Sequence, residues 1–209
     1  TLEDLNRFAI AGRYDEITEE LIKKWFALNY AKMQESTGLM LSEERRKSAL
    51  DQVLNYFDKR KEHIRKVWKA EEKVELVLPE YILQGVIDLI EDDDGKIEIV
   101  DYKTGRKPDL PEKSAQVEHY RKQLEIYAYL ISERYKKNVS RMHLYYTNEA
   151  EENPLVTFEY SKNCVDKEIE DVSQTVRKIE DKRFDAKAEN DYSCRYCDMK
   201  YMCKKVKNY

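Results

Sequence analysis

The sequence predicts an α/β domain in which helices flank a central mixed β-sheet and a helical part comes first. Apolar residues recur with helical spacing as far as about residue 68, and short β-prone runs bounded by turns follow. A long helical run and two further β-prone runs come next, which gives the order helices–β–β–β–α–β–β–α. With 209 residues, the chain is long enough for one domain with a substantial core.

The first 69 residues are predicted to be helical. Residues 2–10 have the pattern of the end of a helix, and residues 15–34 form a second, amphipathic helix. Ser42 is a good N-cap for a third helix that continues to about Trp68. We expect the apolar faces of these helices to pack in the core.

After this point the apolar period changes from helical to strand-like. The predicted elements are strands at 74–78, near 81–91 and at 96–103, a helix at about 114–136, strands at 142–146 and 156–160, and a helix from Ser161 to about 181. An Asp-Asp-Gly turn at 93–95 joins two β-prone runs, which is typical of a hairpin.

Polar residues that suit a reaction centre lie on this hairpin and on the helix that follows it. Because strand side chains alternate between faces, Asp101 and Lys103 point to the same side. Asp88 lies on the adjoining strand among apolar residues, where a carboxylate is costly to bury without a partner. Gln123 and Tyr127 are four residues apart and share a helix face. Two carboxylates beside a lysine suit a hard divalent cation and an anionic transition state.

At these residues the chain resembles the PD-(D/E)XK nucleases of the RecB-like branch, whose core has the order α–β–β–β–α–β. The resemblance implies a restriction-endonuclease-like core and magnesium-dependent cleavage of DNA phosphodiester bonds. It implies that Asp88 and Asp101 bind Mg²⁺ or Mn²⁺. It also implies that Lys103 positions or polarises the attacking water or the scissile phosphate, and that Gln123 and Tyr127 support the site and the DNA strand.

Three cysteines near the C-terminus, Cys194, Cys197 and Cys203, have the spacing of a metal or cluster site rather than of a disulfide framework. Zinc and iron–sulfur clusters usually need four protein ligands. We expect the remaining cysteine, Cys164, to act as a small hydrophobe.

Nucleases of helicase–nuclease and CRISPR-adaptation enzymes resemble the chain at these three cysteines. In those proteins a fourth cysteine, far upstream, completes a four-iron, four-sulfur cluster. This sequence has no upstream cysteine. The alternatives are therefore a 4Fe-4S cluster whose fourth ligand is missing from this chain, and zinc bound by the three cysteines with one His or Asp.

The RecB-like pattern opens with a helix of the form Gly-Thr-x-x-His-x-x-Leu-Glu, and this sequence starts at Thr1, just after the expected histidine. We interpret residues 1–209 as a single nuclease domain that is a fragment of a longer protein. Its expected parts are a helical part at 1–69, a catalytic core at 70–160, and a C-terminal helix with the cysteine cluster at 161–209.

The details of the sequence most resemble the C-terminal nuclease domain of UvrD/Rep-type DNA helicases. This resemblance implies a parent ATP-dependent DNA helicase that acts in DNA repair or recombination, with the motor domains of the same polypeptide as partners. The chain itself has no phosphate-binding Gly-x-x-x-x-Gly-Lys loop. Two alternatives stay open, namely a catalytically degenerate DNA-binding module of a helicase and a stand-alone CRISPR-adaptation-type exonuclease.

Composition limits the partners that are expected. With 38 Lys and Arg against 42 Asp and Glu, the formal net charge is −4, so DNA binding must use local basic patches rather than a positive field around the whole molecule. No apolar run approaches the length of a membrane span, and no signal peptide is visible. We therefore expect a cytoplasmic protein that does not insert in membranes.

Overall fold

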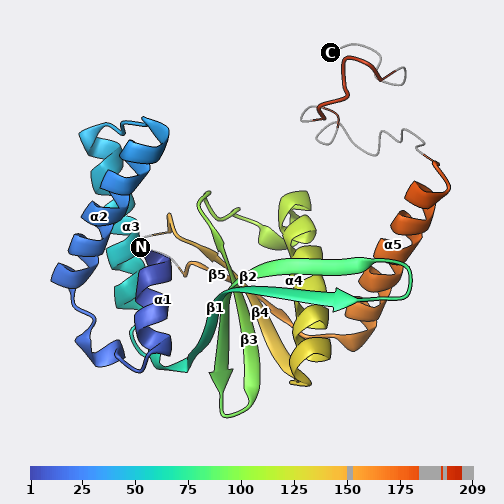
Figure 1. The fold of residues 1–209 in the computed structure, drawn as a ribbon, viewed down its shortest axis with the longest axis horizontal. Coiled ribbons are helices and arrows are strands. Elements are labelled where there is room, and N and C mark those ends of the chain that lie inside the picture. The colour runs from blue at the N-terminus through green and yellow to red at the C-terminus, as the bar shows by residue number, and fades with distance from the viewer. Residues whose placement is uncertain (150–152, 184–193, 195–196, 204–209) are drawn as a thin grey trace. The chain divides into compact units, whose positions relative to one another are not determined.

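The computed structural model describes residues 1–149, 153–183, 194 and 197–203. It divides into two compact units, Thr1–Ile169 and Glu170–Tyr209. The first unit contains the whole β-sheet and is shown with its helices in Figure 1. Within the described residues, no helix is both long and apolar enough to cross a membrane.

The structure confirms the predicted fold class, a mixed five-stranded sheet with flanking helices. The helices are α1 (Leu2–Ile10), α2 (Glu19–Thr37), α3 (Glu43–Arg60), α4 (Ala115–Tyr135) and α5 (Lys162–Glu180). The strands are β1 (Val67–Val77), β2 (Ile82–Asp93), β3 (Lys96–Lys103), β4 (Val139–Tyr146) and β5 (Leu155–Glu159). Short 3₁₀ turns occur at Tyr14–Glu16, Ile64–Lys66 and Pro111–Lys113.

The strands follow one another across the sheet in the order β1-β2-β3-β4-β5. Neighbouring strands are antiparallel except for β3 and β4, which are parallel. A parallel pair cannot be joined by a tight turn, so the chain crosses over through α4 between these two strands. This connection places α4 over the end of β3, where Asp101 and Lys103 lie.

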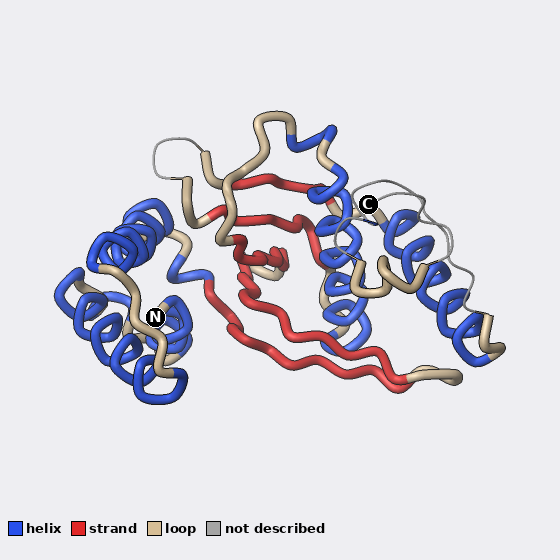
Figure 2. Tube along the Cα trace, turned by 90° about the horizontal axis from the view of Figure 1, so that it is seen from above, coloured by secondary structure: helices blue, strands red, loops and turns tan. Residues whose placement is uncertain are grey.

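The sheet lies between two groups of helices, as Figure 2 shows from above. Helix α4 packs on one face through residues such as Leu124 and Ile131, which share a buried cluster with Ile99 of β3. Helices α1, α2 and α3 contribute to a second cluster that contains Val100. Consecutive residues of β3 therefore point into different cores, as the alternation of strand side chains requires.

The N-terminal helical part differs from the prediction at its end. The hydroxyl of Ser42 caps α3 as expected, accepting a 3.3 Å hydrogen bond from the backbone N–H of Arg45. However, α3 ends at Arg60, and the prediction that this helix reaches Trp68 is wrong. Trp68 belongs to β1, where it packs edge-on against Tyr135 of α4 at 5.0 Å between ring centroids. Pairing of the flanking residues Val67 and Lys69 with β2, and the contact of Trp68 with α4, thus outweigh the helical pattern.

Candidate active site

The candidate site forms where β2 separates from β3. The ladder between these strands ends at the pair of Leu89 and Val100. Asp88 is the next residue of β2, and its Oδ2 accepts a 2.8 Å hydrogen bond from the backbone N–H of Tyr102. This side chain replaces the missing ladder bond, which places the carboxylate of Asp88 beside the stretch of β3 that carries Asp101.

Strand β3 supplies an acid and a lysine on one face. Asp101 is 4% exposed, and its Oδ2 lies 2.6 Å from Nζ of Lys103, which makes a nearly buried ion pair. Apart from this lysine, Oδ2 of Asp101 has no hydrogen-bond partner in the part of the chain that the structure describes. One oxygen of a buried carboxylate is therefore available for a further positive ligand.

Helix α4 brings the amide and the phenol to the same place. The Nε2 amide of Gln123 donates a 2.8 Å hydrogen bond to the hydroxyl of Tyr127, and its Oε1 accepts one of 3.4 Å from Nζ of Lys103. Leu124, which is fully buried, anchors this stretch of α4 against the sheet. The structure thus brings Gln123 and Tyr127 together with Lys103 and, through it, with Asp101.

The two carboxylates of the site resist ionisation. Burial raises the pKa of Asp88 to about 6; the hydrogen bond from Tyr102 opposes this rise, and the nearby charge of Asp101 adds to it. Burial also raises the pKa of Asp101, although the ammonium of Lys103 opposes the increase. Acids that share a site and have raised pKa values are typical of functional centres, where the protein itself compensates their charge only in part.

These carboxylates fit a small divalent cation. Their oxygens are hard ligands, and bound positive charge would offset the cost that raises both pKa values. Among the described residues, no group of three or more His, Cys, Asp or Glu is placed to hold a metal ion. Two carboxylates nevertheless suit Mg²⁺, which usually keeps several waters and binds substrate phosphates as well.

The C-terminal cysteines lie in the second unit and are free thiols. Within the described residues, Cys194, Cys197 and Cys203 do not lie together in a group that could hold a metal ion. The residues between the first two, 195–196, lie outside the described part.

Two residues of the site were missed by the sequence analysis. The ring of Tyr120 faces Lys103, with 3.8 Å between Nζ and the ring centroid. Gly85 lies beneath Tyr127, because a Cβ at this position would be 2.9 Å from Cε1 of that ring. The sequence contains a signal for each of these residues. Tyr120 precedes Gln123 by one helical turn, so the two share a helix face, and a glycine inside a strand often marks a place where another group approaches the backbone closely.

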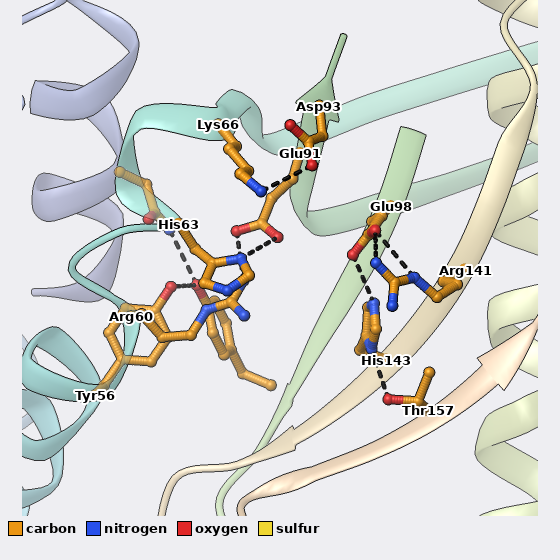
Figure 3. A network of polar contacts seen from close by, with 12 residues as sticks. Tyr56, Arg60, His63, Lys66, Glu91, Asp93, Glu98, Arg141, His143 and Thr157 are labelled. Carbon is orange, nitrogen blue, oxygen red and sulfur yellow. Dashed lines mark hydrogen bonds and ion pairs between the residues drawn. The ribbon is translucent and has the colours of Figure 1, made fainter. Parts of the chain in front are cut away.

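A second polar cluster lies farther along the same strands, on the face that carries α3 (Figure 3). Glu91 and Glu98 are directly opposed on β2 and β3, and both are buried. Like charges in this position repel, but each has a cationic or imidazole partner. Arg60 pairs with Glu91, and Nε2 of His143 lies 3.0 Å from Glu98. This cluster is internally compensated, unlike the site at Asp88.

Comparisons with known proteins bear on the whole chain. The sequence model of the PD-(D/E)XK nuclease superfamily matches residues 2–204. The crystal structure of a candidate exonuclease from Eubacterium rectale is similar, with a TM-score of 0.55 and 10% identity over 95% of this chain and 80% of that one. A structure named SSO0001 has a TM-score of 0.42 and 14% identity, over 97% of this chain and 95% of that one. No curated protein matches the sequence.

Proposed function

The chain belongs to the PD-(D/E)XK nuclease superfamily, and we propose on that premise that it is a magnesium-dependent nuclease that hydrolyses DNA phosphodiester bonds. The observation that carries this proposal is the cluster at the β2–β3 separation. There, Asp88 and Asp101 have raised pKa values, and Lys103 lies beside them. A module that only binds DNA has no need of this combination of two acids and a lysine.

The roles of the residues follow from their contacts. Asp88 and Asp101 would hold Mg²⁺ or Mn²⁺, which supplies Lewis-acid chemistry by offsetting charge on the phosphate and making water more acidic. The ammonium of Lys103, held 2.6 Å from Oδ2 of Asp101, would donate to a phosphate oxygen or to the attacking water. Gln123 orients this lysine, and the hydrogen bond from Gln123 to Tyr127 fixes the amide in turn.

Three acid and lysine variants test the proposal. Asp88→Asn and Asp101→Asn should abolish cleavage of fluorescent single- and double-stranded DNA in Mg²⁺ or Mn²⁺. Lys103→Ala should lower the rate on the order of 10²-fold while DNA affinity changes little, because a preorganised charge acts mainly at the transition state.

Matched controls are available on the same strands. Asp93→Asn on β2 and Lys96→Ala on β3 remove the same side-chain types away from the site and should cleave like the unmodified chain. Full activity of Asp101→Asn would refute the site. DNA binding without cleavage by the unmodified chain in either metal would favour the degenerate binding module instead.

We also propose that the domain works within a helicase–nuclease in DNA repair or recombination, with the motor domains of the same polypeptide delivering the strand. The support is the sequence resemblance to the C-terminal nuclease domains of UvrD/Rep-type helicases. The proposed division, with a helical part, a catalytic core and a C-terminal cysteine region, follows from the same resemblance. A longer chain that carries the motor should couple ATP hydrolysis to cleavage.

Finally, we propose that Cys194, Cys197 and Cys203 bind a structural metal, supported by their spacing in the sequence. Metal analysis of the anaerobically purified protein distinguishes the two candidates. Iron with acid-labile sulfide indicates a 4Fe-4S cluster, whereas stoichiometric zinc indicates a mononuclear site with a fourth local ligand. A chain that purifies and folds without either metal would refute the assignment.

A further inference from the structure

Tyr120 is a half-buried residue of α4 that lies beside the candidate site. The face of its ring lies against Lys103, with 3.8 Å between Nζ and the ring centroid. Its hydroxyl accepts a 2.9 Å hydrogen bond from Nε2 of Gln116, one turn earlier in the helix. The ring is therefore held at its outer end by a neighbour and presents its electron-rich face to the ammonium.

The surroundings of Lys103 explain what this ring contributes. An ammonium has three donor directions. Nζ of Lys103 has Asp101 at 2.6 Å, Gln123 at 3.4 Å and the ring of Tyr120 on a third side. With its side chain only 16% exposed, the lysine has little water around it. The ring thus takes the place of solvent that would otherwise pull the ammonium out of the site.

We propose that Tyr120 is a positioning residue that holds the ammonium of Lys103 against Asp101 and Gln123. The inference rests on the proposed role of Lys103 in the nuclease reaction. It extends that role to a residue outside the Asp, Lys, Gln and Tyr set predicted from sequence. The ring face, rather than the hydroxyl, is the group that acts, because the hydroxyl contacts Gln116 and not the lysine.

The same helix offers a matched control. Tyr135 also has a lysine over its ring, with Nζ of Lys69 at 5.1 Å from the centroid, but this pair lies at the other end of α4, away from the site. Replacing Tyr135 by leucine removes a longer tyrosine–lysine contact, together with the edge contact to Trp68 and the hydrogen bond to Glu72. Its effect on kcat reports what the loss of these contacts away from the site does through the fold.

The first measurement needs no activity. A ring shields nuclei above its face, so in ¹H–¹³C spectra of lysine-labelled protein the Cε–Hε signal of Lys103 should be shifted upfield. The signal is assigned as the one missing in Lys103→Arg. The shift should persist in Tyr120→Phe and disappear in Tyr120→Leu. An unshifted Lys103 signal in the unmodified chain overturns the proposal, whether or not any variant folds.

The second measurement is kinetic. Tyr120→Leu should lower kcat on the order of 10-fold, the scale of a partly desolvated cation–π contact, with Tyr120→Phe near full activity. The Kd for DNA should stay within about twofold, because ground-state affinity comes mainly from many phosphate contacts. Tyr135→Leu should leave kcat unchanged. In a Lys103→Ala background, Tyr120→Leu should cause no further loss, since the ring acts through the lysine.

The outcomes separate this proposal from the function on which it rests. If Lys103→Ala inactivates the chain but Tyr120→Leu cleaves normally, the nuclease assignment stands and the role of Tyr120 is refuted. If Tyr120→Leu mainly weakens DNA binding, the ring contacts the substrate and does not position the lysine. If Lys103→Ala cleaves normally, the proposed site itself fails.

Discussion

Replacing Asp88 with asparagine should stabilise the metal-free protein at neutral pH while destroying the proposed activity. Burial raises the pKa of Asp88 to about 6, whereas its value in the unfolded chain is about 3.9. Between these values the folded state binds more protons than the unfolded state, so stability falls as the pH rises from about 4 to 6. Above about pH 6 the carboxylate is charged in both states, so the folded state bears the full free-energy cost of the buried charge, which asparagine removes.

The magnitude follows from this difference in pKa. A difference of about 2 pKa units corresponds to about 2.7 kcal/mol, and partial exposure of the carboxylate reduces the expected gain to about 1–2 kcal/mol. The side-chain carbonyl of asparagine can still accept the hydrogen bond from the N–H of Tyr102. The substitution therefore removes the charge and keeps the contact that joins β2 to β3.

Urea denaturation in EDTA at pH 7.5 and at pH 4.5 measures the effect. The Asp88→Asn variant should have a higher midpoint at pH 7.5, with a smaller difference at pH 4.5. Added Mg²⁺ should stabilise only the unmodified chain, because it binds the folded state of that chain. Asp101→Asn is the contrasting variant: the ammonium of Lys103 already offsets part of the cost of burying this carboxylate, so the gain in midpoint should be smaller than for Asp88→Asn. Equal stability of Asp88→Asn and the unmodified chain at both pH values would refute the reasoning.

Two further predictions concern packing and the second polar cluster. Gly85→Ala should lower the free energy of unfolding by about 1–3 kcal/mol and also lower kcat, because the added Cβ would press on the ring of Tyr127. Melting curves and cleavage rates measure both effects. Gly105→Ala is the control, because a Cβ there meets no atom within 4 Å. Arg60→Leu should cost about 3–5 kcal/mol, because it removes the guanidinium that pairs with the buried carboxylate of Glu91 and leaves that carboxylate with the more distant His63, at 3.8 Å. The double variant with Glu91→Leu should recover most of this loss in urea denaturation. A double variant no more stable than Arg60→Leu would contradict the second prediction.

The parts of the structure that depend on local periodicity were predictable from sequence. Strand β3 has the predicted bounds, and its alternation puts Asp101 and Lys103 on one face. The four-residue spacing of Gln123 and Tyr127 likewise matches the hydrogen bond between their side chains. These relations need only the geometry of a strand and of a helix.

Other features depend on which elements pair, and no periodicity encodes that. Trp68 continues a helical pattern in sequence, yet its neighbours Val67 and Lys69 pair with β2, and Trp68 lies at the irregularity between them in β1. The position of Asp88 beside β3 depends on where the β2–β3 ladder stops, which is a property of the assembled sheet. The contact between Tyr120 and Lys103 depends on the packing of α4 against the end of β3.

The electrostatics of β2 and β3 indicate why one acidic pair suits a reaction centre and the other does not. Although burial alone would raise it, the pKa of Glu91 is lowered by His63 and Arg60, so the chain itself stabilises that carboxylate. Among the described residues, Asp88 accepts a hydrogen bond from a backbone N–H and lies near both Asp101 and Lys103, but burial outweighs these contacts and its pKa is raised. A carboxylate that the chain already neutralises gains little from an added cation. A buried carboxylate whose charge the protein offsets only in part has a raised pKa, and it is stabilised when a cation binds to it. In the proposed reaction, a metal bound at Asp88 would therefore recover stability that the metal-free fold gives up there.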